Sequence, residues 1–170
     1  MLHWLLLGAG MSLAAWQDVK RHKIPNVLSL SMAFGGLLLG VSEGAAGVKT
    51  SLAGLLTGFA VGFLLWLIGV IRAGDAKLMS AIGAVIGWKG FLDCLLWGLV
   101  TGAVFGLLIL LKKRKLRERM ARLRTYFVGM ILFHTPQAYE PEKGSEGELP
   151  FALPLLIGCF LAYCFPIFAI

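Results

Sequence analysis

Apolar runs long enough to cross a lipid bilayer follow one another along this chain. Residues 50–71 and 150–170 contain no charged side chain, and residues 91–111 contain only Asp93. A membrane-spanning helix needs about 20 mainly apolar residues. Charged residues make up 15% of the chain and hydrophobic residues 58%, whereas soluble domains carry about 25% charged residues. The sequence therefore excludes an ordinary soluble domain and predicts an integral membrane protein.

The apolar runs predict an all-α polytopic membrane protein, with about six transmembrane helices in a single domain covering residues 1–170. The glycines at positions 54, 58 and 62 repeat at four-residue spacing, so they share one helix face. A face without side chains predicts close approach of another helix. The expected spans are 2–17, 27–41, 50–71, 76–88, 91–111 and 150–170, with a basic cytoplasmic loop at 112–149.

Lysine and arginine are concentrated in alternate loops. Lys20, Arg21, Arg72 and Lys77 lie in two of these loops, and a dense basic run begins at 112. Loops rich in Lys and Arg face the cytoplasm, and a basic run beside a span usually contacts anionic lipid rather than nucleic acid. This orientation places the ends of the first and fourth spans at the cytoplasmic face of the membrane.

Two carboxylates lie at that face, Asp18 and Asp75. A charge at the edge of the hydrocarbon is costly and indicates a functional site. Two close carboxylates share one proton, so one can activate water while the other donates to a carbonyl oxygen, which suits peptide hydrolysis. Gly74 would permit unusual backbone angles and close approach of an extended peptide.

Other interpretations of the two acids stay open at this point. Asp75 could cap a helix N-terminus, and Asp18 could pair with Lys20 or Arg21 at the interface. A small ion-coupled transporter or a non-catalytic partner in pilus or secretion assembly could also use such acids. No His or Cys lies near both acids in the sequence, so a metal site is not expected, and the three cysteines are interpreted as small apolar residues.

Three motifs nevertheless resemble those of the type IV prepilin peptidases. Asp18 is followed after five residues by Ile24-Pro25-Asn26, which is similar to the family's first signature. Gly74-Asp75, with Lys77-Leu78 behind it, is similar to the family's Gly-x-Gly-Asp motif, although Arg72 stands where the motif has its first Gly. The stretch 151–155 is similar to a third, weaker motif.

The resemblance implies an intramembrane aspartic endopeptidase without cofactors. Such enzymes cut the short basic leader from prepilin or pseudopilin substrates at the cytoplasmic face of the bacterial or archaeal cytoplasmic membrane. The chain is similar to the short form associated with tight-adherence or Flp-type pili, so methyltransferase activity and S-adenosylmethionine are not expected. The implied catalytic residues are Asp18 and Asp75, and the implied positioning residues are Gly74, Lys77, Pro25 and Asn26.

Overall fold

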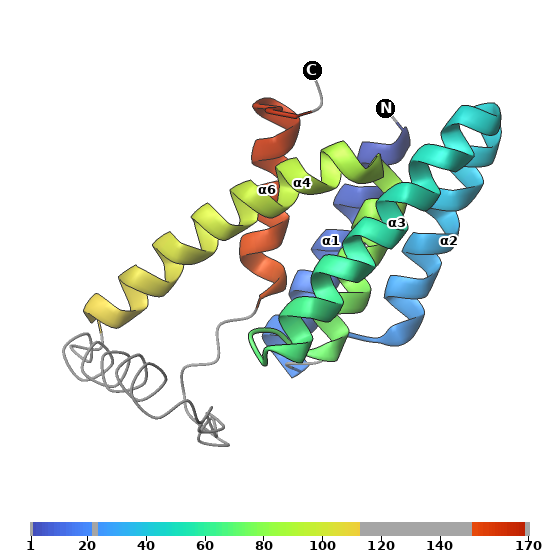
Figure 1. Cartoon of the computed structure of the whole chain (residues 1–170). Helices are drawn as coiled ribbons and strands as arrows, with labels where there is room; N and C mark the ends of the chain where they lie inside the picture. Colours follow the sequence, from blue (N-terminus) through green and yellow to red (C-terminus); the bar gives the residue numbers. More distant parts are fainter. Residues whose placement is uncertain (1, 22–23, 113–150, 169–170) are drawn as a thin grey trace, which may run out of the picture. The chain divides into compact units, whose positions relative to one another are not determined.

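A computed structural model describes residues 2–21, 24–112 and 151–168, and within these ranges all regular secondary structure is helical (Figure 1). The fold is therefore all-α, as the sequence predicts. The helices are α1 (Leu2–Arg21), α2 (Asn26–Ser42), α3 (Gly44–Leu67), α4 (Ala73–Lys112) and α6 (Ala152–Cys164).

The chain divides into two compact units. One unit comprises Met1–Gly102 together with Pro150–Ile170, and the other comprises Ala103–Leu149. In the second unit the structure describes only the final turns of α4, up to Lys112. The basic loop predicted at 112–149 therefore lies, apart from its first residue, outside the described residues. The candidate site and its packing belong entirely to the first unit.

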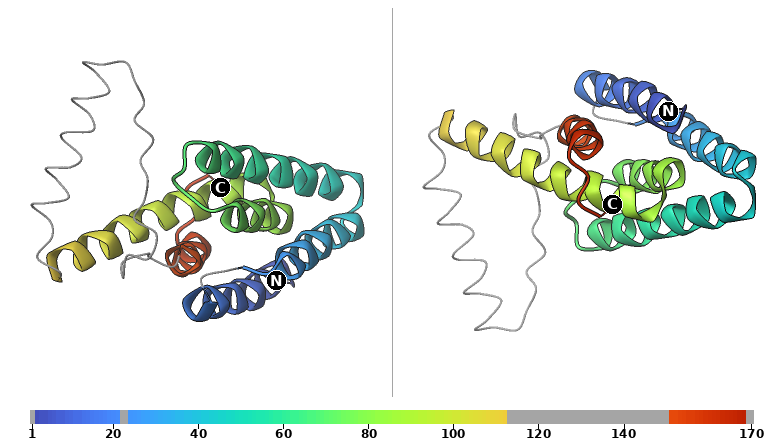
Figure 2. Two further views of the ribbon diagram at one scale, coloured as in Figure 1. Left: turned by 90° about the horizontal axis from the view of Figure 1, so that it is seen from below. Right: turned by 90° about the horizontal axis from the view of Figure 1, so that it is seen from above.

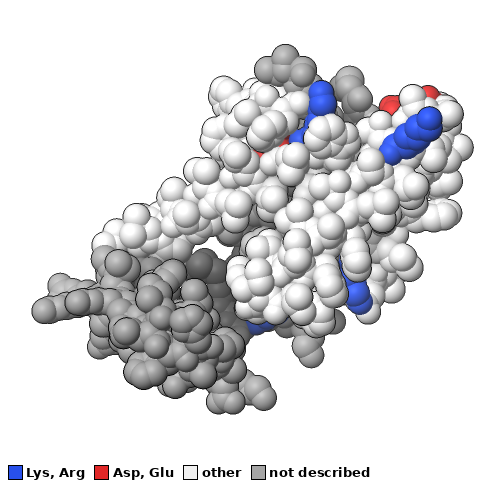
Figure 3. All heavy atoms as spheres, in the orientation of Figure 1, with Lys and Arg blue, Asp and Glu red and all other residues white. Residues whose placement is uncertain are grey.

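Two helices of the described chain are long and apolar enough to cross a membrane, Gly44–Leu67 and Ala73–Ile109. Asn26–Ser42 and Ala152–Cys164 are apolar but shorter. Many large apolar side chains are exposed on these helices, including Phe34, Leu67 and Phe160. Among the described residues on the face drawn in Figure 3, charged side chains appear at only a few points, and the rest of their surface is uncharged. Such an apolar exterior suits contact with lipid.

The helix boundaries differ from the sequence prediction at two informative places. The first helix continues to Arg21, so Asp18 lies inside α1 rather than in a loop. The predicted spans 76–88 and 91–111 follow one another in α4, which is interrupted at Gly87 (φ 75°, ψ 174°) rather than at the predicted turn of Lys89-Gly90. Only glycine adopts this positive φ readily, so the backbone changes direction there.

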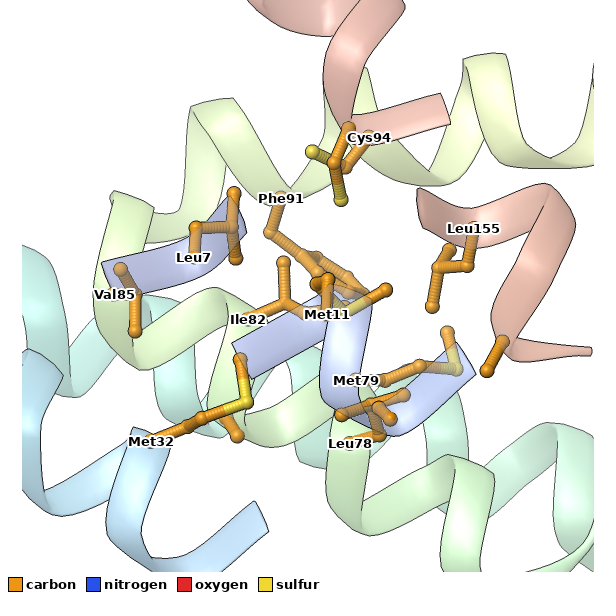
Figure 4. Packing of buried hydrophobic residues seen from close by; sticks show 14 of the residues in the cluster. Leu7, Met11, Met32, Leu78, Met79, Ile82, Val85, Phe91, Cys94 and Leu155 are labelled. Atoms are coloured by element: carbon orange, nitrogen blue, oxygen red, sulfur yellow. The ribbon is translucent and has the colours of Figure 1, made fainter. Parts of the chain in front are cut away.

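The part of α4 before Gly87 is the centre of the first unit. Residues of this segment that point in different directions around the helix are fully buried, among them Leu78, Met79 and Ile82. A helix buried all round carries no amphipathic stripe. Figure 4 shows these side chains packed against the others of the core, which come from α1, α2, the later part of α4 and α6: Leu7, Met11, Met32, Phe91, Cys94 and Leu155.

Glycines bring α3 against this central segment. A Cβ atom built on Gly62 would lie 2.8 Å from the Cα atom of Ala76, and one built on Gly58 would collide with the Met79 carbonyl oxygen. Gly54 meets the backbone of Gly83 in the same way. The predicted close-packing face is confirmed, and Figure 2 shows α3 running alongside the first part of α4 in both views.

The same segment is held from a second side by α2. A Cβ atom on Gly36 would lie 2.7 Å from the backbone nitrogen of Val85, so α2 and α4 also approach at backbone distance. Beyond Gly87, α4 packs against α6, where a Cβ on Gly158 would lie 2.6 Å from the Cα atom of Gly98. Close packing of this kind leaves the start of α4 little freedom to move.

Candidate active site

Asp18 lies in the last turn of α1 and points into the protein, with 4% of its surface exposed. Its Oδ2 atom accepts a hydrogen bond of 3.1 Å from the backbone N–H of Ala152, the first residue of α6. The Lys20 ammonium lies 4.2 Å from the centre of the Trp16 ring on the outer side of the helix. Asp18 is thus directed at the N-terminus of α6, where backbone N–H groups favour a negative charge.

Asp75 lies in the first turn of α4 and is 6% exposed. Its Oδ2 atom accepts a hydrogen bond of 3.1 Å from the backbone N–H of Arg72. The Arg72 carbonyl in turn accepts from the N–H groups of Asp75 (3.0 Å) and Ala76 (3.2 Å). In a capping box, the side chain at the third helical position bonds to the N–H of the N-cap residue, and Asp75 makes this contact with Arg72. Asp75 therefore caps the start of its helix, but from the third helical position rather than as the N-cap residue.

The fold brings these two acids into electrostatic interaction, although they come from helices far apart in the sequence. Each carboxylate uses Oδ2 for a backbone N–H at a helix start. Among the described residues, the Oδ1 atom of each has no hydrogen-bond partner, so one oxygen of each acid remains available to water or a substrate. The arrangement can therefore hold and exchange a proton while both side chains stay fixed in position.

The two sequence motifs also meet through their polar residues. The Lys77 Nζ atom donates a hydrogen bond of 3.0 Å to Oδ1 of Asn26, joining the start of α4 to the start of α2. Pro25 precedes α2 in an extended conformation (φ −64°, ψ 135°), and its carbonyl accepts the first backbone hydrogen bond of that helix, from the N–H of Leu28 at 3.1 Å. Pro25 thus sets the direction from which Asn26 reaches Lys77.

Gly74 does not have the backbone role expected of it. It lies in the first turn of α4, and the described glycines with positive φ are Gly44, Gly69 and Gly87. A Cβ atom on Gly74 would meet the Cβ atom of Ile24 at 3.7 Å, an ordinary contact. Gly74 therefore does not use the unusual backbone angles that glycine permits, and the expected close approach of an extended peptide stays a prediction. The left-handed glycine of this stretch is Gly69 (φ 81°), in the turn before α4.

The contribution of α6 could not be deduced from the residues. In the sequence the stretch 151–155 shows only a resemblance to a motif, whereas its contact with Asp18 is made by a backbone N–H. Backbone groups have no signature in a sequence. Within residues 2–21, 24–112 and 151–168, no group of three or more His, Cys, Asp or Glu side chains could hold a metal ion.

Comparisons with known proteins show what this chain is similar to. The family model described as the type IV leader peptidase family matches residues 5–107. A protein named prepilin leader peptidase/N-methyltransferase from Aeromonas salmonicida (strain A449) is 30% identical over 120 residues, which are 66% of this chain and 40% of the relative. A protein of the same name from Dickeya chrysanthemi is 29% identical over 114 residues, covering 61% of this chain and 39% of the relative.

A third relative is similar over a shorter stretch. The prepilin leader peptidase/N-methyltransferase of Myxococcus xanthus (strain DK1622) is 32% identical over 96 residues, which are 50% of this chain and 29% of that protein. The chain thus spans 40% or less of the length of these relatives. No solved structure matches the chain significantly.

Proposed function

The chain belongs to the type IV leader peptidase family, and from this premise we propose that it is an aspartic endopeptidase that removes the leader peptide of prepilin-like proteins. Asp18 and Asp75 are the proposed catalytic pair. The observation that carries the proposal is that two buried carboxylates from the two motifs interact electrostatically, each held through one oxygen. The N-methyltransferase activity in the relatives' names is not carried over to this chain.

The proposed reaction uses water as nucleophile. The ionised carboxylate removes a proton from water while the water oxygen attacks the scissile carbonyl carbon. The protonated carboxyl group donates its proton to the carbonyl oxygen. Collapse of the gem-diol intermediate then breaks the C–N bond: one carboxyl group gives its proton to the leaving amine, and a hydroxyl of the intermediate returns a proton to the other carboxylate as the product carboxyl group forms. The atoms balance without a covalent enzyme intermediate, and the pair ends with the single proton it started with.

The distribution of charge supports placing this reaction at the cytoplasmic face. Lys20 and Arg21 follow Asp18 in α1, and Arg72 and Lys77 flank Asp75. Cationic residues favour the cytoplasmic end of a span. We propose a multi-pass protein of about six spans in the cytoplasmic membrane, oriented with the aspartates at that face. Its substrate is a prepilin-like protein with a short basic leader.

The test is direct cleavage. The purified chain, reconstituted in lipid vesicles, is incubated with a prepilin-like protein from the same genome, and the new N-terminus is identified by mass spectrometry. We expect a single cut at the junction of the basic leader and the apolar segment, and the same rate in the presence of a metal chelator. Absence of cleavage by a folded, inserted chain would overturn the proposal.

The Lys77–Asn26 hydrogen bond gives a second expectation. Replacing Lys77 with Met should lower the cleavage rate several-fold, because this exposed hydrogen bond contributes about 0.5–1.5 kcal/mol and about 1.4 kcal/mol corresponds to a factor of ten. Lys49→Met removes an exposed lysine beside the α2–α3 turn and should have no effect. Cleavage assays on Lys77→Met, Asn26→Leu and the double variant measure the coupling.

The double variant decides the interpretation. If the two side chains act through their mutual bond, the double variant should be little worse than either single variant, since the second change removes nothing further. Full additivity of the two losses would show that Lys77 and Asn26 act independently of each other.

A further inference from the structure

Helix α6 is hydrogen-bonded at both ends to aspartates of other helices. At its start, the Ala152 N–H donates to Asp18, 3.1 Å away. Beyond its end, the backbone N–H groups of Ile167 and Phe168 both donate to Oδ1 of Asp93, at 3.0 and 2.9 Å. Asp93 belongs to the later part of α4 and is 1% exposed. The catalytic mechanism proposed above does not use this buried carboxylate.

A second side chain of α4 strengthens the attachment at this end. Trp97 lies one helical turn after Asp93, and its Nε1–H donates a hydrogen bond of 3.1 Å to the carbonyl oxygen of Phe165. The Trp97 and Phe165 rings also pack together, with their centres 6.4 Å apart. Three hydrogen bonds from one face of α4 therefore hold the segment that follows α6, where the backbone no longer satisfies its own N–H and C=O groups.

The contact between α4 and α6 continues toward the start of α6. Gly158 lies against the backbone of Gly98, and the Thr101 hydroxyl lies 2.9 Å from the Pro154 carbonyl oxygen. A helix is stiff along its axis, and the 13 residues of α6 span about 20 Å. A displacement of its far end therefore moves the Ala152 N–H relative to Asp18, and displacements of about 1 Å are enough to impair catalysis.

We propose that Asp93 is a positioning residue for the cleavage reaction. It fixes α6 along the axis of that helix, and α6 presents the Ala152 N–H that holds one oxygen of Asp18. The inference rests on the proposed role of Asp18 in catalysis. Asp93 acts at a distance through α6 and touches no reacting atom.

The hydrogen-bond pattern provides a conservative variant that separates this role from proton transfer. Both backbone N–H groups donate to the same oxygen of Asp93, and an asparagine amide retains an oxygen of that kind. Asp93→Asn therefore keeps the acceptor and removes the charge, whereas Asp93→Ala removes the acceptor. At a catalytic carboxylate the asparagine variant is inactive instead, because an amide cannot exchange the proton.

The experiment compares these variants in reconstituted vesicles. We expect Asp93→Ala to lower kcat at least tenfold with KM unchanged, and Asp93→Asn to stay within about twofold of the wild type. Trp97→Phe removes one hydrogen bond and keeps an aromatic ring, so it should lower kcat a few-fold. This variant tests the same attachment if Asp93→Ala fails to accumulate in the membrane. A wild-type kcat in Asp93→Ala, or equal losses in the asparagine and alanine variants, would overturn the inference.

Hydrogen exchange gives a measurement that does not depend on activity. Exchange of the peptide covering residues 151–158 should be faster in Asp93→Ala than in the wild type, and unchanged in Asp93→Asn, because release of the far end loosens the Ala152 N–H. Failure of the wild-type chain to cleave prepilin would refute the proposed function and leave this exchange pattern to stand. Equal exchange in all three proteins would refute the attachment itself.

Discussion

Replacing Asp75 with asparagine will leave the chain unable to release a prepilin leader at a measurable rate. The amide keeps the size of the side chain and can still accept the hydrogen bond from the Arg72 N–H, so α4 should begin normally. It cannot hold and release the proton that the reaction needs. Loss of a general acid or base lowers rates about 10²- to 10⁴-fold. The measurement is the initial rate of leader release from a purified prepilin-like protein.

The same loss is expected for Asp18→Asn, and the double variant should be no worse than either single one, since paired catalytic groups act as a unit. The matched control is Asp93→Asn, which also replaces a buried aspartate of a helix and is expected to stay active. Each variant must insert and fold to the level of the wild type. Normal cleavage by a folded Asp18→Asn or Asp75→Asn chain would remove that residue from the proposed pair.

A Cβ atom at Gly58 will destabilise the protein more than the same atom at almost any lipid-facing position. In Gly58→Ala the new methyl group collides with the carbonyl oxygen of Met79 and lies 2.9 Å from the Cα atom of Ser80. Both are backbone atoms, which cannot rotate away as a side chain can. Forcing extra atoms into a packed contact costs about 1–3 kcal/mol, and this should appear as a lower midpoint of thermal unfolding in detergent.

Gly8→Ala provides the control, because a Cβ atom at Gly8 of α1 has no other atom within 4 Å. Alanine is the better helix former by about 1 kcal/mol, so this variant should unfold at the wild-type temperature or slightly above it. Should both alanine variants unfold at the same temperature, the close contact between α3 and α4 would not be the source of stability that the geometry indicates.

Some features of the fold were accessible from the sequence because they depend on residue type and spacing alone. Glycines four residues apart share a helix face whatever surrounds them. This spacing predicted a close helix contact, and Gly54, Gly58 and Gly62 do lie against α4. The resemblance implied that Asn26 and Lys77 are positioning residues but did not predict their hydrogen bond, since no local rule pairs two residues so far apart in the chain.

Other features depend on tertiary context and were missed. Lys89-Gly90 carries a strong turn signal, yet the break falls at Gly87, where a Cβ atom would lie 2.6 Å from the Thr50 side chain of α3. The choice between two nearby glycines was therefore made by packing rather than by composition. The structure also gives the unusual Arg72 a backbone role, because its N–H and C=O groups both bond to the first turn of α4.

The apolar exterior of the helices has a consequence for the proposed reaction. Exposed side chains such as Phe34, Leu67 and Phe160 suit contact with lipid, and the proposed prepilin-like substrate would be held in the bilayer by its own apolar segment. On the proposed function, the two would meet by lateral diffusion in two dimensions. Their encounter rate depends on the number of substrate molecules per lipid rather than per litre, so adding lipid at constant protein dilutes the reaction. Kinetic constants for the proposed reaction would accordingly be surface quantities, expressed as mole fractions in the membrane.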